Sequence, residues 1–131
     1  MNALKDKKNQ LIVIFLGLLY AAITYWPVFY MDINMVSRTF FIIWFSGALV
    51  IGCISVIFCK NEVLRSAAFV TIGFVLAVVL RIVYDSIGDA NSHNLAGIEV
   101  VIAVFYAFPG GLVGAIIGRV IQKKMTKKPK E

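Results

Sequence analysis

Four long apolar stretches dominate the chain and limit what it can fold into. They cover residues 11–31, 40–58, 66–84 and 98–121, and short polar segments separate them. About 20 apolar residues are enough for one helix to cross the hydrocarbon core of a bilayer. Backbone groups cannot stay unpaired in lipid, and runs this long fit a helix and not a barrel strand. The sequence therefore predicts an all-α integral membrane protein, a four-helix transmembrane bundle whose sequential helices are antiparallel neighbours.

The composition agrees with this fold class. Of the 131 residues, 60% are hydrophobic and 15% are charged, whereas about a quarter of residues are charged in soluble domains. Four spans use almost the whole length, so we expect a single transmembrane domain at 1–121. A short basic tail follows at 122–131.

Basic residues predict the orientation of the bundle. All Lys and Arg residues except Arg38 and Arg81 fall in the N-terminal segment, the middle loop, or the end of the last span and the tail. These places share one side when the number of spans is even. The positive-inside rule makes that side cytoplasmic, with both termini there, and we expect a plasma membrane of the bacterial inner-membrane type. The basic tail either anchors this topology or attracts anionic lipid or an acidic partner, and nothing in it suggests nucleic-acid binding.

The fourth apolar stretch is rich in small residues at helical spacing. Two adjacent rows contain Ala103, Ala107, Gly111 and Ala115, and Gly110, Gly114 and Gly118. Small residues let membrane helices approach closely, so this face either packs inside the bundle or serves a homodimer or a foreign helix. Pro109 lies in the same stretch and predicts a kink, which is either a plain bend or a place where freed carbonyls bind a ligand.

Polar residues gather at the outer end of the third and fourth stretches. The candidate cluster contains Arg81, Asp85, Asp89, His93 and Glu99. A charge inside a span is costly, so we expect Arg81 to pair with Asp85 or Glu99, and Asn94 to cap the last helix. The cluster is a structural clasp, a cation or substrate site, or a recognition surface for another protein. We assign it no resident metal or cofactor.

Known catalytic patterns do not fit these residues. The spacing of Asp85 and Asp89 is also found in CDP-alcohol phosphotransferases, but their other aspartates and the accompanying Gly and Arg positions are absent. In intramembrane aspartyl proteases the two catalytic aspartates come from different helices. Asp85 and Asp89 are only four residues apart and cannot lie on different transmembrane helices. One His and no Gly-x-Ser-x-Gly motif exclude serine hydrolase chemistry. We therefore expect no enzymatic activity.

The architecture resembles, in span number and compactness only, the four-helix immunity proteins that protect bacterial inner membranes from pore-forming toxins. This resemblance implies protein–protein contact in the membrane. Our leading hypothesis is a non-enzymatic contact protein of immunity, inhibitor or accessory-subunit type. The alternative is a small oligomeric transporter or channel, in which Arg81, Asp85 and Glu99 converge on a hydrated cavity near Pro109.

Overall fold

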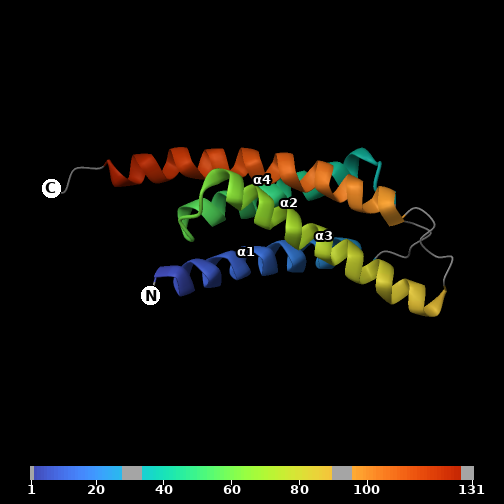
Figure 1. The fold of residues 1–131 in the computed structure, drawn as a ribbon. Helices are drawn as coiled ribbons and strands as arrows, with labels where there is room; N and C mark the ends of the chain where they lie inside the picture. The colour runs from blue at the N-terminus through green and yellow to red at the C-terminus, as the bar shows by residue number, and fades with distance from the viewer. Residues whose placement is uncertain (1, 28–33, 90–95, 128–131) are drawn as a thin grey trace.

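The computed structural model describes residues 2–27, 34–89 and 96–127, and this part of the chain contains four helices (Figure 1). They are α1 (Asn2–Tyr25), α2 (Arg38–Ile57), α3 (Val63–Gly88) and α4 (Ala96–Thr126). Each helix is long and apolar enough to cross a membrane, and the predicted four-helix transmembrane bundle is confirmed. The start of α1 and the end of α4 lie at the same end of the bundle (Figure 1).

The helix ends differ from the predicted spans for local reasons. α1 ends at Tyr25 because Pro27 restricts the residue before it to extended backbone, while residues 28–31 of the predicted span lie outside the described residues. α2 begins after Ser37, whose side-chain oxygen accepts a hydrogen bond from the Phe40 N–H. α3 ends at Gly88, four residues beyond the predicted span. α4 continues to Thr126, so the first residues of the predicted tail are helical.

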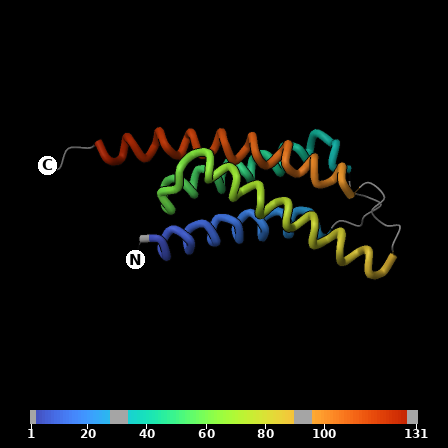
Figure 2. The backbone as a smooth tube through the Cα atoms, in the orientation of Figure 1, coloured from blue at the N-terminus to red at the C-terminus, as the bar shows by residue number. Residues whose placement is uncertain are grey.

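The most extensive helix contact joins two helices that run in the same direction. Sequential helices are antiparallel, but α2 packs most extensively against α4, and α1 packs chiefly against α3 (Figure 2). α3 also packs against α4 and holds the two pairs together. α1 touches α2 over a small area and, among the described residues, makes no contact with α4. The bundle is therefore closed on the α3–α4 side and more open between α1 and α2.

Glycines set the close approach of α2 and α4. A Cβ atom on Gly110 or Gly118 would lie 2.7 Å from the carbonyl oxygen of Phe45 or Cys53, and one on Gly114 would overlap a carbonyl oxygen of α2 even more closely. These contacts recur every four residues on both helices, which keeps the two parallel helices in register. Only glycine fits at such backbone-to-backbone contacts, and this is how membrane helices gain van der Waals contact without a hydrophobic driving force.

Glycines also set the close approach of α1 and α3, at two positions. A Cβ atom on Gly17 would lie 2.9 Å from the Val70 carbonyl oxygen, and one on Gly73 would overlap the Ile14 carbonyl oxygen. α1 and α2, by contrast, are held apart by large aromatic side chains. Trp44 is fully buried there, with its ring centroid 5.8 Å from that of Tyr25.

Candidate functional site

The outer cluster is built around the buried side chain of Arg81, which is 5% exposed. Its Nε atom lies 3.2 Å from Oδ2 of Asp85, one turn later on α3. Its Nη1 atom donates to the backbone carbonyl of Tyr25, the last residue of α1. The final carbonyls of a helix have no partner within the helix, and a cation is favourable at that end of the helix dipole. Arg81 therefore closes the end of α1 while it pairs with Asp85.

Tyr25 extends the cluster from α3 to α4. The guanidinium carbon of Arg81 lies 4.6 Å from the centre of the Tyr25 ring, within the range of a cation–π contact. The Tyr25 hydroxyl donates to Oε2 of Glu99 at 2.8 Å. Glu99 is 8% exposed and lies in the first turn of α4, where a negative charge is favourable. One polar network thus joins α1, α3 and α4.

The remaining residues predicted for the cluster are placed differently. Asp89 is the C-cap of α3 and is exposed, and its backbone N–H donates to the Asp85 carbonyl at 3.0 Å. His93 and the predicted cap Asn94 lie outside the described residues. In the part of the chain that the structure describes, no group of three or more His, Cys, Asp or Glu side chains is arranged to hold a metal ion. The geometry supports the clasp interpretation for Arg81, Asp85 and Glu99.

Tyr25 is the residue of this cluster that sequence reasoning missed. An aromatic residue near the end of an apolar stretch is typical of the membrane interface, a role that needs no partner inside the bundle. A useful signal was available, because an aromatic residue with a hydroxyl group ends the first span at the depth of Arg81. Buried Tyr hydroxyls usually find a hydrogen-bond partner.

The small face of α4 lies between α2 and α3. All of its predicted members are buried, namely Ala103, Ala107, Gly110, Gly111, Gly114, Ala115 and Gly118. A Cβ atom on Gly111 would lie 3.3 Å from the Cα of Ala67 on α3, while Gly114 meets α2. The chain's own helices therefore cover this face. Pro109 is exposed and α4 is helical on both sides of it, and the kink expected there stays a prediction.

A second polar network, which sequence reasoning also missed, lies at the opposite end of the bundle. The hydroxyls of Ser55 on α2 and Ser66 on α3 are fully buried and 2.8 Å apart, and the Asn61 side chain donates to Ser55. The Asn9 side chain on α1 donates to the Cys59 carbonyl at 3.1 Å.

α4 joins this end of the bundle as well. The Gln122 side chain donates to the Val56 carbonyl of α2 at 3.2 Å. Hydrogen bonds therefore tie all four helices near the α2–α3 connection. None of these residues stands out in the sequence, because Ser, Asn and Gln near the end of a span are ordinary.

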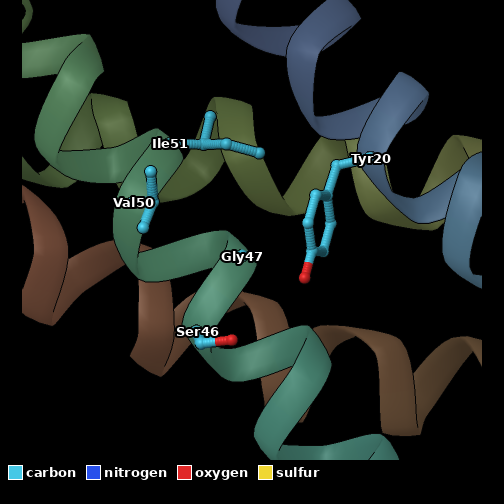
Figure 3. A pocket seen from close by; sticks show the side chains of 5 residues that line it. All are labelled: Tyr20, Ser46, Gly47, Val50 and Ile51. Atoms are coloured by element: carbon cyan, nitrogen blue, oxygen red, sulfur yellow. The ribbon is translucent and has the colours of Figure 1, made fainter.

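The more open side of the bundle contains a groove between α1 and α2. It has a volume of about 200 Å³ and is lined by Tyr20, Ser46, Gly47, Val50 and Ile51 (Figure 3). The Tyr20 ring lies against Gly47, where a Cβ atom would overlap the ring. Val50 is 53% exposed at the rim. The lining is almost entirely apolar and belongs to the middle of α2.

Hydrogen bonds to the chain's own backbone occupy the two hydroxyl groups at this groove. The Tyr20 hydroxyl donates to the Ile43 carbonyl at 2.7 Å, and the Ser46 hydroxyl donates to the same carbonyl at 3.0 Å. The groove therefore presents a mainly apolar surface with a small residue at its base.

Comparison with known proteins adds no further assignment. No protein-family model, curated protein or solved structure matches this chain.

Proposed function

We propose that this chain is a non-enzymatic membrane protein that acts by contact with another membrane protein through its α1–α2 face. The observation that carries the proposal is the groove lined by Tyr20, Ser46, Gly47, Val50 and Ile51. The small face of α4, the other candidate surface, is covered by α2 and α3. On the α1–α2 side, the groove and the small, exposed residue Ser46 lie together at the bundle surface.

The chemistry of the groove favours a transmembrane helix as the partner. Its lining is apolar and lies in the middle of α2, a depth that water-soluble proteins do not reach. Ser46 is small and exposed, which allows the backbone of another helix to approach closely. α1 also has exposed large apolar side chains, including Phe15, Leu19 and Ile23.

A partner of this kind fits an immunity, inhibitor or accessory-subunit role. In that role the chain would lie in a plasma membrane of the bacterial inner-membrane type, with both termini cytoplasmic. The concentration of exposed lysines where α1 begins and α4 ends supports this orientation. The polar cluster then fixes α1, one of the two helices that border the groove, against α3 and α4.

The alternative function, transport, receives no comparable support. It predicts that Arg81, Asp85 and Glu99 meet a hydrated cavity near Pro109. Arg81 and Glu99 are instead buried around Tyr25, and ten residues separate Glu99 from Pro109, about 15 Å along α4.

Photo-crosslinking in the membrane tests the proposal. We expect benzoylphenylalanine at Val50 to form a discrete protein adduct in membranes of cells that produce the chain, because this position borders the groove. The same probe at Val113, which is 40% exposed on α4, is the matched control and should give no such adduct. An adduct of twice the chain's mass would identify the partner as a second copy. Identical products from both positions, or lipid adducts alone, would contradict the proposal.

A further inference from the structure

α1 begins and α4 ends at the same end of the bundle (Figure 1), and the residues at this end have a strong positive charge. In the described residues it contains exposed basic side chains from three helices and one loop: Lys5, Lys7, Lys8, Lys60, Arg65, Arg119, Lys123, Lys124 and Lys127. The acidic residues described at this end are Asp6 and Glu62, and Glu62 pairs with Arg65 at 3.4 Å. The opposite end is close to neutral, since Asp85, Asp89 and Glu99 oppose Arg81 and Arg38 there.

The last turns of α4 extend this charge beyond α2. The hydrogen bond from Gln122 to the Val56 carbonyl attaches α4 to the final turn of α2, which ends at Ile57. α4 continues to Thr126, so Lys123 and Lys124 lie past the end of its neighbour. The basic side chains here are exposed near the boundary of the apolar spans.

The last turns of α4 carry both basic and apolar exposed side chains. Arg119 and Lys123 lie one turn apart on α4, Lys127 follows its last residue at the same spacing, and we call these three residues the basic stripe. Exposed apolar side chains form a second stripe at the same spacing, and they are Ile117, Ile121 and Met125. At 100° per residue the apolar stripe lies largely opposite Arg119, and the exposed Lys124 lies beside it, so basic side chains are found on more than one side of these turns. Met125, in the last turn of α4, is 64% exposed.

We propose that the basic stripe Arg119–Lys123–Lys127 binds the headgroups of anionic phospholipids. Basic side chains clustered where a transmembrane helix reaches the surface of the bilayer are attracted to anionic lipid headgroups. Each basic residue near an anionic surface contributes about 1 kcal/mol, which corresponds to about fivefold in binding. This inference does not depend on the groove or on a protein partner.

Electron spin resonance with spin-labelled lipids measures this preference directly. The full chain is reconstituted in phosphatidylcholine vesicles, and the association of spin-labelled phosphatidylglycerol is compared with that of spin-labelled phosphatidylcholine. Because one headgroup contacts about one basic residue at a time, we expect the wild-type chain to prefer phosphatidylglycerol about fivefold. In 1 M salt, where the Debye length is about 3 Å, the preference should nearly disappear.

Two matched variants locate the effect. Replacing the stripe by Arg119→Gln, Lys123→Gln and Lys127→Gln should reduce the preference to less than about twofold. The matched variant with Lys5→Gln, Lys7→Gln and Lys8→Gln removes the same charge from α1. It should retain most of the preference for phosphatidylglycerol. Arg119→Lys retains the charge and should retain the preference, which separates charge from an effect on folding. The proposal is overturned if the wild-type chain shows no preference for phosphatidylglycerol, as expected if the stripe binds an acidic protein. It is also overturned if both triple variants lose the preference equally.

Discussion

Gly114→Ala is expected to lower the free energy of unfolding by about 3 kcal/mol, the upper end of the usual cost of overpacking a tight interface. The added Cβ atom would overlap the Leu49 carbonyl oxygen of α2. This neighbour is backbone and cannot rotate away, so α2 and α4 must separate. Separation loosens the most extensive helix contact of the bundle. Unfolding in mixed micelles, induced by a denaturing detergent and followed by circular dichroism, measures the loss.

Gly97→Ala provides the control on the same helix. No heavy atom outside its local helix lies within 4 Å of a Cβ atom placed there, so the same substitution meets no neighbour. Alanine has the higher helix propensity, and we expect this variant to be unchanged or more stable by up to about 1 kcal/mol. If Gly114→Ala is as stable as Gly97→Ala, then α2 and α4 are not in backbone contact in the membrane.

Arg81→Ala is expected to destabilise the protein by about 3 to 5 kcal/mol, the usual cost of removing one member of a buried ion pair. The substitution leaves the Asp85 carboxylate without its guanidinium. It also removes the donor at the Tyr25 carbonyl and the cation on the Tyr25 ring. The same detergent titration measures the effect.

Arg119→Ala is the control for removal of an arginine. Arg119 is exposed and donates to Gln122 within its own helix, so its loss should cost less than about 1 kcal/mol. A double-mutant cycle that combines Arg81→Ala with Tyr25→Phe measures the coupling between Arg81 and the Tyr25 hydroxyl, which donates to Glu99. The Tyr25→Phe variant keeps the ring but removes the hydroxyl. We expect a coupling energy of about 1 kcal/mol between positions 81 and 25. Equal losses for Arg81→Ala and Arg119→Ala would show that the Arg81 network does not support the bundle.

Hydropathy and helical periodicity account for most of the fold. The number and class of helices follow from the apolar stretches, and the ion pair of Arg81 and Asp85 follows from their spacing of one helical turn. The buried face of α4 follows from its two rows of small residues. Each of these features depends on one segment of sequence alone.

Features that depend on how helices pack together could not be predicted from single segments of sequence. The glycines of α4 indicate a close approach, but not that the parallel helix α2 provides the carbonyls of Phe45, Leu49 and Cys53. Likewise, the contact of Tyr25 with both Arg81 and Glu99 needs the relative positions of three helices. The groove beside Tyr20 arises because large aromatic side chains separate α1 from α2.

The account depends on a polar cluster that is buried and internal, and water access beside Glu99 tests this most directly. Ala103 lies one turn below Glu99 on α4 and is fully buried, whereas Ser86 is exposed in the last turn of α3. Cysteine is placed at each position in a chain with Cys53 and Cys59 replaced by alanine. Burial raises the pKa of the Cys59 thiol and slows its reaction, but this thiol would still contribute background.

A membrane-impermeant maleimide is then added from the side of the cluster. The account predicts that the Ser86→Cys variant is labelled while the Ala103→Cys variant stays unlabelled over the same period. Labelling of both variants at similar rates would contradict it, because water would then reach the interior beside Glu99 and the cluster would be a hydrated site.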